Sequence, residues 1–231
     1  MGKIGTVIFD ADDTLWENEL YYKEFEGRFC GLLARSMPAA QASGELFKTE
    51  MKNLGVYGYG LKGMMLSMIE TACRVLGDAG GMRAAGEIIR LGQELMQKPV
   101  ELLGGVGEAI PALSKEYRLA LATKGDLFDQ KRKIAASGLQ GFFRHIEIMP
   151  EKKKGDYERL FGSLGCAPEN VLMVGNSMKS DIIPVLELGG RAVHIPHHIT
   201  WEHEHFDGEF SHPNFTRLNS IRELPEYLSL V

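Results

Sequence analysis

Three acids and a threonine follow an apolar run near the start of the chain. After residues 7–9, the sequence places Asp10, Asp12, Asp13 and Thr14 within five positions. Carboxylates are costly to take out of water unless positive charge binds them. Ligands of open α/β sheets bind beyond the carboxyl ends of the strands. We therefore expect these acids to hold a cation, together with an anionic substrate.

Later in the chain, further polar groups occupy the same kind of position. Each comes after the carboxyl end of a segment that is predicted to be a strand. Because such ends share one edge of a parallel sheet, residues far apart in the sequence should converge there. The residues concerned are Thr123, Lys152, Asn176 and Asp181.

Strands and helices must alternate to bring these groups together. The apolar pattern predicts strands at 4–9, 118–122, 145–149, 171–174 and 192–195. It predicts helices at 128–136, 157–164 and 182–188, a helix that follows the turn at 104–107 and runs through 113, and a tail at 218–230 that ends in a helix. This repeat of βαβ units predicts an α/β fold with a Rossmann-like, doubly wound, mostly parallel sheet.

The segment between the first two strands is different, since it shows helical periodicity and no convincing strand. Four helices are predicted there, one of them ending at Gly77 and the last ending before Pro99. We therefore expect a catalytic core formed by residues 1–15 and 102–231, with an all-helical cap inserted at 16–101.

Taken in order, the four polar groups resemble the motifs of the haloacid dehalogenase-like (HAD) superfamily, most of whose members are phosphatases. The first motif reads hydrophobic–Asp–x–Asp–x–Thr at residues 9–14; the others are a strand ending in Thr123, a lysine before a helix, and an acidic turn at 175–181. Four ordered elements with a helical insert are far more specific than a single motif. The resemblance covers nearly the whole chain and implies a cap that closes over the substrate.

The resemblance also implies roles for the individual residues. Phosphoryl transfer can proceed through a carboxylate nucleophile, which forms an aspartyl-phosphate, with a second carboxylate acting as acid and then base. The implied catalytic residues are Asp10 as nucleophile, Asp12 as acid and base, Thr123 as a hydrogen-bond donor to phosphate, and Lys152 as the balancing charge. Asn18 and Lys124 are candidate substrate contacts.

A hard cation, Mg²⁺, is the implied cofactor, bound by Asp10, the backbone carbonyl of Asp12, Asp181 and Asn176. The sequence departs from the family pattern at three points. Asp13 stands where the family usually has glycine, so it either adds charge near the metal or caps the next turn. Asn176 replaces a frequent aspartate and removes one charge. The run 152–154 leaves open which of three lysines contacts phosphate.

Asp12 favours hydrolysis of a small phosphate monoester over carbon–halogen cleavage, because an alkoxide needs a proton to leave and a halide does not. A haloacid dehalogenase or a phosphomutase of the same superfamily remains the alternative. From another class, a phospho-accepting signalling domain or a catalytically weak binding protein is also open. The large helical insert favours the hydrolase over a signalling domain.

Composition gives the broad class. The 231 residues carry a net charge of −5, with no basic block and no apolar stretch of membrane-spanning length, so nucleic acid and membranes are not expected partners. Three separated cysteines and no signal-peptide pattern predict a reduced cytoplasmic protein. The expected partner is a small phosphorylated metabolite, and oligomeric state is left open. We interpret the histidines at 194–212 as an exposed polar loop rather than a zinc site, with His197 facing the rim of the site.

Overall fold

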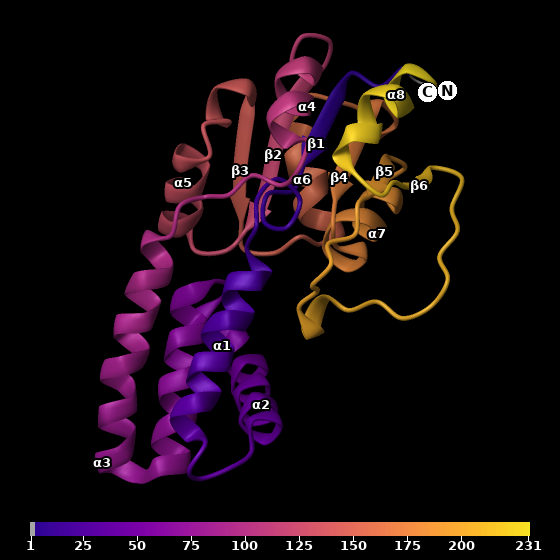
Figure 1. Ribbon diagram of the computed structural model, residues 1–231. Coiled ribbons are helices and arrows are strands. Elements are labelled where there is room, and N and C mark those ends of the chain that lie inside the picture. The colour runs from indigo at the N-terminus through magenta and orange to yellow at the C-terminus, as the bar shows by residue number, and fades with distance from the viewer. Residues whose placement is uncertain (1–2) are drawn as a thin grey trace. The chain divides into compact units, whose positions relative to one another are not determined.

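The computed structural model describes residues 3–231, and the chain divides into two compact units. The sheet unit comprises residues 3–19, 100–124 and 130–231. The helical unit comprises residues 20–99 and 125–129 (Figure 1). Each unit has a hydrophobic core of its own.

A six-stranded parallel sheet forms the centre of the sheet unit. Its strands are β1 (Thr6–Phe9), β2 (Arg118–Lys124), β3 (His145–Met149), β4 (Val171–Gly175), β5 (Arg191–His194) and β6 (Phe215–Arg217). They are arranged in the order β3-β2-β1-β4-β5-β6, and every neighbouring pair is parallel. The predicted α/β fold with a doubly wound parallel sheet is confirmed. Because β1 is central, its carboxyl end lies between those of β2 and β4.

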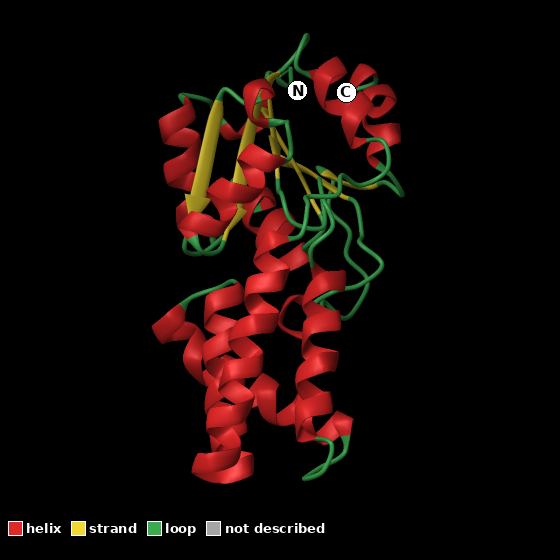
Figure 2. Ribbon diagram, turned by 60° about the vertical axis from the view of Figure 1, so that its left-hand side comes forward, coloured by secondary structure: helices red, strands yellow, loops and turns green. Residues whose placement is uncertain are grey.

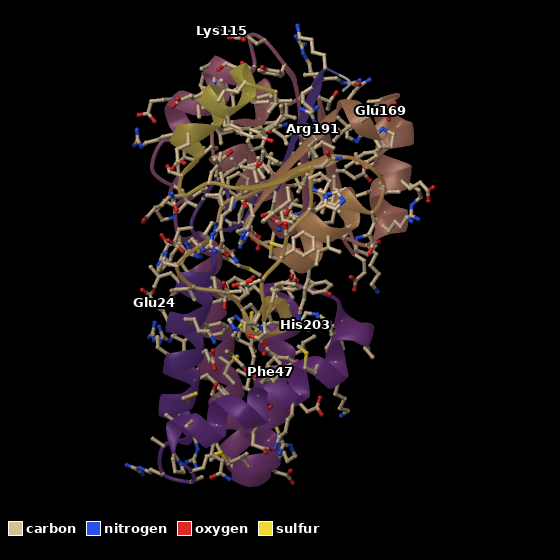
Figure 3. The ribbon with its side chains drawn as sticks, turned by 90° about the vertical axis from the view of Figure 1, so that its right-hand side faces the viewer. Glu24, Phe47, Lys115, Glu169, Arg191 and His203 are labelled. Carbon is tan, nitrogen blue, oxygen red and sulfur yellow. The ribbon has the colours of Figure 1, made fainter. Side chains whose placement is uncertain are left out.

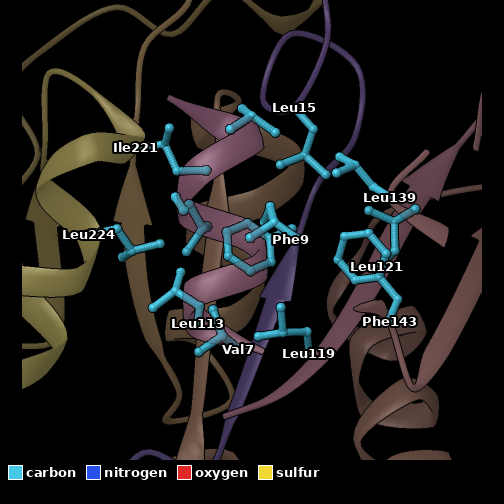
Figure 4. Packing of buried hydrophobic residues seen from close by; sticks show 14 of the residues in the cluster. Val7, Phe9, Leu15, Leu113, Leu119, Leu121, Leu139, Phe143, Ile221 and Leu224 are labelled. Atoms are coloured by element: carbon cyan, nitrogen blue, oxygen red, sulfur yellow. The ribbon is translucent and has the colours of Figure 1, made fainter. Parts of the chain in front are cut away.

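Helices cover both faces of this sheet (Figure 2). They are α4 (Val106–Leu113), α5 (Leu127–Ala136), α6 (Lys154–Leu164), α7 (Ile183–Leu186) and α8 (Leu224–Ser229). Alternate residues of β1 point to opposite faces. Val7 and Phe9 pack in the cluster drawn in Figure 4, with residues of α4 and α8. Ile8 packs in a second cluster that includes α6. Burial on both faces explains why β1 is a continuous apolar run.

Several element bounds differ from those expected from the sequence. Strand β2 continues through Thr123 and Lys124, two residues beyond the end predicted at 122. The helix predicted at 182–188 begins instead as a π-helical turn over Met178–Ile182 and continues as α7. Strand β6 was not predicted; with three residues, none of them fully buried, it has too little apolar pattern to detect.

The helical unit contains α2 (Ala39–Tyr57), α3 (Leu61–Gln97) and all of α1 (Glu19–Leu33) except its first residue. We expected two helices where α3 runs, separated at Gly77. Gly77 does interrupt α3, with φ of 67° and ψ of 178°, but helix continues directly on both sides. No helix within residues 3–231 is both long and apolar enough to cross a membrane. All three cysteines are free thiols: Cys30 is buried, Cys166 is partly buried and Cys73 is exposed.

Candidate active site

A buried cluster of charged side chains lies at the carboxyl edge of the sheet, between β1 and β4. Lys152 Nζ contacts Asp10 Oδ1 and lies 2.7 Å from Asp181 Oδ1. Asp10 directly follows β1, and Asp181 lies in the π-helical turn after β4. All three side chains are buried. Lys153 and Lys154, the other lysines of the triplet, are exposed.

Two carboxylates share one ammonium group in this cluster, so the charges do not balance. Burial raises the pKa of Asp10 to about 7; the charge of Lys152 opposes this shift and that of Asp181 adds to it. Burial would lower the pKa of Lys152, but the two carboxylates outweigh it and raise the pKa instead. A further cation at this position would therefore be stabilised by the buried negative charge.

The turn after β4 is built to hold Asp181 in place. The backbone N–H of Ser177 donates to Asp181 Oδ2 at 3.0 Å, and the Asp181 N–H donates to the Ser177 carbonyl at 2.9 Å. Gly175 makes room for this carboxylate, because a Cβ at that position would lie 2.3 Å from Asp181 Oδ2. Glycine is therefore required by close approach to the side chain.

Thr14, to which the sequence reasoning gave no role, links the first and last motifs. Its hydroxyl lies 2.9 Å from Asp10 Oδ2 and 3.3 Å from Asn176 Oδ1. Both partners are oxygen acceptors, and the hydroxyl has one proton, which it donates to Asp10 in the shorter contact. The DxDxT spacing already contained this residue, because a turn returns Thr14 towards Asp10 four positions earlier.

Asp12 is held separately from Asp10 by side chains that the sequence did not single out. Lys133 Nζ lies 2.7 Å from both of its carboxylate oxygens, Gln130 Nε2 donates to it at 2.9 Å, and Trp16 Nε1 at 2.7 Å. Burial would raise the pKa of Asp12, but the charge and hydrogen bonds of Lys133, with those of Gln130 and Trp16, lower it below its usual value. Asp12 is therefore a carboxylate in this state.

Gln130 and Lys133 also place two other predicted residues. Gln130 Nε2 donates to Thr123 Oγ1 at 3.1 Å, which connects Thr123 to Asp12 through one side chain. Lys133 Nζ donates to Asn18 Oδ1 at 3.1 Å. Gln130 and Lys133 are three apart on α5 and so share a helix face, but this spacing alone does not show that the face meets Asp12.

Asp13 caps the backbone that leads into α1. Its Oδ1 accepts the N–H groups of Asn18 at 3.0 Å and Glu19 at 2.9 Å. Asp13 has φ of 61°, a left-handed conformation that aspartate adopts more readily than most residues. Burial raises its pKa to about 8, against the effect of the Glu19 N–H. Of our two readings of this departure from glycine, the structure shows the turn-capping contacts.

Lys124, a candidate substrate contact, is engaged by the loop that follows β5. Its ammonium contacts Glu204 and donates to Ser180 Oγ at 2.9 Å. Glu204 lies in the short helical turn that carries His203 (Figure 3). Burial would raise the pKa of Glu204, but Lys124 and the hydroxyls of Ser177 and Ser180 lower it to about 2.

The donor chemistry of the site fits a hard divalent cation. Asp10 and Asp181 offer buried carboxylate oxygens, and Asn176 offers an amide oxygen beside Thr14. Oxygen donors of this kind are those that Mg²⁺ prefers. The excess of carboxylate over ammonium charge around Lys152 supports the same assignment.

The motifs and the fold can now be compared with known proteins. A family model described as haloacid dehalogenase-like hydrolase matches residues 4–189. The chain belongs to this family. It is therefore a HAD-family hydrolase, and the predicted resemblance is confirmed. A solved structure of a haloacid dehalogenase-like family hydrolase from Xanthomonas campestris has 35% identity and a TM-score of 0.86, covering 98% of this chain and 91% of that one.

Characterised relatives of this HAD-family hydrolase include phosphatases. The glyceraldehyde 3-phosphate phosphatase of Methanothermobacter thermautotrophicus is 30% identical over 120 residues, which is 50% of this chain and 53% of that protein. The N-acylneuraminate-9-phosphatase of Mus musculus is 31% identical over 121 residues, 50% of this chain and 49% of that protein. The chain thus spans about half the length of these curated relatives.

Proposed function

We propose that this hydrolase cleaves a small phosphate monoester through an aspartyl-phosphate on Asp10. The observation that carries the proposal is the buried contact of Lys152 with both Asp10 and Asp181. It supports a phosphoryl-transfer centre in which Lys152 supplies positive charge beside a carboxylate nucleophile, and in which the second carboxylate favours binding of a cation. The phosphatase relatives favour the same reaction class.

In the first half-reaction, an oxygen of Asp10 attacks phosphorus, the bond from phosphorus to the ester oxygen breaks, and the leaving alkoxide takes a proton from Asp12. In the second, water attacks phosphorus, the bond to Asp10 breaks, and Asp12 receives a proton from that water. Lys133 holds Asp12 as a carboxylate, the form needed to accept a proton. The acid role therefore requires Asp12 to gain a proton before the ester is cleaved.

We propose roles around the phosphoryl group for the other predicted residues. Thr123 would donate its hydroxyl to a phosphoryl oxygen, and Lys152 would neutralise charge that develops there. Thr14 donates to Asp10 and so fixes the orientation of the nucleophile. Lys124 and Asn18 stay candidate substrate contacts. Lys124 donates a hydrogen bond to Ser180, and Asn18 accepts one from Lys133.

We propose Mg²⁺ as the cofactor, held by Asp10, the carbonyl of Asp12, Asp181 and Asn176. When bound, the ion would neutralise phosphate charge and keep Asp10 ionised. Asn176 in place of a carboxylate lowers the negative charge of this set, so weaker metal binding is expected than with a third acid.

We assign the helical insert, expected from the sequence at 16–101, as the cap that selects the substrate. In the structure residues 20–99 of this insert belong to the helical unit, whereas residues 16–19, 100 and 101 belong to the sheet unit. A small phosphorylated metabolite is the proposed substrate class, since the relatives are named for glyceraldehyde 3-phosphate and N-acylneuraminate-9-phosphate. A phosphomutase would use the same pair of aspartates and stays the alternative.

The test is a screen of phosphorylated metabolites and an aryl phosphate, with 2-haloacids included. We expect phosphate release that EDTA abolishes and Mg²⁺ restores. Asp10→Asn should lose turnover with an unchanged circular dichroism spectrum, whereas the matched change Asp207→Asn, at an exposed residue of the 196–214 loop, should leave the rate unaltered. Turnover of a haloacid alone, or full activity in Asp10→Asn, would overturn the assignment.

A further inference from the structure

A histidine pair in the loop after β5 meets an acid from the segment after β1. Glu17, His197 and His198 each offer a metal-ligating atom, and these atoms lie within 4.8 Å of one another. His197 Nε2 and Glu17 Oε1 lie 3.2 Å apart. All three residues belong to the sheet unit. We expected an exposed loop here, but the His197 side chain is only 4% exposed.

The other nitrogen of His197 determines what its Nε2 can do. His197 Nδ1 lies 2.9 Å from the carbonyl oxygen of Ile199. The backbone N–H of Ile199 also lies 3.4 Å from Nδ1, and one nitrogen cannot both accept from that N–H and donate to the carbonyl. We assign the proton to Nδ1 on the shorter contact, because a carbonyl oxygen only accepts; the neutral ring then has its lone pair on Nε2. Histidines that bind metals are typically held in this way, with the second ring nitrogen donating to a carbonyl or carboxylate.

Two buried atoms of the cluster lack hydrogen bonds. Among the residues that the structure describes, His197 Nε2 and Glu17 Oε1 have no hydrogen-bond partner. They face each other as a lone pair and a carboxylate oxygen, an unfavourable arrangement in a buried place unless a positive charge lies between them. The imidazole ring of His198 lies beside that of His197, with ring centroids 4.2 Å apart.

The distance between His197 Nε2 and Glu17 Oε1 fits two ligands of one metal ion. With zinc bonds of about 2.0–2.1 Å to nitrogen and oxygen, two ligands of a tetrahedral ion are about 3.3 Å apart. His197 Nε2 and Glu17 Oε1 lie 3.2 Å apart. We propose that Glu17, His197 and His198 form a binding site for a divalent transition-metal ion of the Zn²⁺ class, with a water molecule as the fourth ligand.

This site is distinct from the proposed Mg²⁺ site in position and chemistry. Its ligands are two imidazoles and one carboxylate, a set that suits zinc better than magnesium. None of the three residues belongs to the Asp10–Lys152–Asp181 cluster. An ion here would link the loop after β5 to the segment that contains Asp13, because His197 Nδ1 lies 3.6 Å from Asp13 Oδ1. The site therefore acts as a structural link beside the catalytic turn, and it does not depend on the proposed reaction.

The test counts bound metal in the full-length chain. EDTA-treated protein is returned to buffer with excess Mg²⁺, which occupies oxygen sites, and is then equilibrated with Zn²⁺ at micromolar free concentration. We expect one zinc per chain by elemental analysis. Co²⁺ in place of Zn²⁺ should give the intense visible absorption of a tetrahedral centre.

Single substitutions assign the site. His198→Ala, at an exposed position, and Glu17→Gln, which keeps side-chain shape, should each weaken zinc affinity about tenfold or more. The matched control His205→Ala, at an exposed histidine of the same loop, should bind zinc as the wild type does. Asp10→Asn should also keep the zinc.

Three results would overturn the site. They are no zinc uptake by the wild type, equal affinity in His198→Ala and the wild type, or loss of the zinc in Asp10→Asn.

Discussion

The ion pair of Asp12 and Lys133 offers the sharpest test of how the site is built. Lys133 lies 2.7 Å from both carboxylate oxygens of Asp12, and the two side chains are 9% and 21% exposed. Lys133→Met removes the charge and keeps most of the apolar stem. It leaves Asp12 with the neutral donors Gln130 and Trp16 alone.

The expected loss of stability follows from this burial. Removing one partner of a fully buried ion pair costs about 3–5 kcal/mol, because the other charge stays without compensation. The partial exposure of Asp12 and its two neutral donors reduce this, so we expect about 2–3 kcal/mol for Lys133→Met. Asp12→Asn leaves Lys133 without its counter-ion and should cost a similar amount. In the double variant no charge is left unpaired, so its loss of stability should be smaller than the sum of the two single losses. The difference is the coupling energy, which we expect to be about 2 kcal/mol.

The assay is urea unfolding followed by tryptophan fluorescence, since Trp16 is buried in the sheet unit and bonded to Asp12. The exposed pair Lys98–Glu24 serves as the control cycle and should show a much smaller coupling. A coupling energy within about 0.5 kcal/mol of zero for Asp12 and Lys133 would refute the reasoning, because it would mean that the two groups act independently.

Two further predictions concern the turn after β4 and the loop that covers it. The pKa of Glu204 falls on folding from 4.5 to about 2, so its ionised form contributes stability above pH 4.5 that is lost as the pH falls towards 2. The ionised Glu204 contributes about 3 kcal/mol to the free energy of unfolding at neutral pH and about 1 kcal/mol at pH 3. The difference in unfolding free energy between the wild type and Glu204→Gln should therefore shrink as the pH is lowered. A difference that is constant with pH would contradict the pairing with Lys124. Gly175→Ala would place a Cβ against Asp181, so the Mg²⁺ concentration for half-maximal activity should rise about tenfold or more. Gly162→Ala, at an exposed helical position with open space around its Cα, should leave that concentration unchanged, and equal behaviour of the two variants would contradict the packing argument.

Much of the fold could be predicted because its signals are local. Strand β1 is a continuous apolar run because both of its faces are covered, and β4 has the same kind of pattern. Strand β3, at the edge of the sheet, instead alternates polar and apolar residues. Strand β6 could not be found, since three half-buried or exposed residues carry no periodicity. Gly77 showed a break in the helix, but sequence alone did not show that helix resumes at once on the other side.

The residues of the site also divide into those that the sequence predicted and those that it did not. Asp10, Lys152 and Asp181 were named from motifs at strand ends, and the parallel sheet brings them together. Lys133 and Glu204 were missed because their partners Asp12 and Lys124 are far away in the sequence. A charged residue on a helix or loop is usually solvated, and only the three-dimensional contacts reveal that these two are paired.

The central claim is that Asp10 becomes phosphorylated during turnover. The direct measurement is to quench the wild-type protein while it hydrolyses a radiolabelled phosphate monoester with Mg²⁺ present, and then to locate the label by peptide mapping. The account predicts label on the peptide that contains Asp10, released by hydroxylamine as expected for an acyl phosphate, and absent from Asp10→Asn. Label on another residue, or turnover that persists in Asp10→Asn, would contradict it.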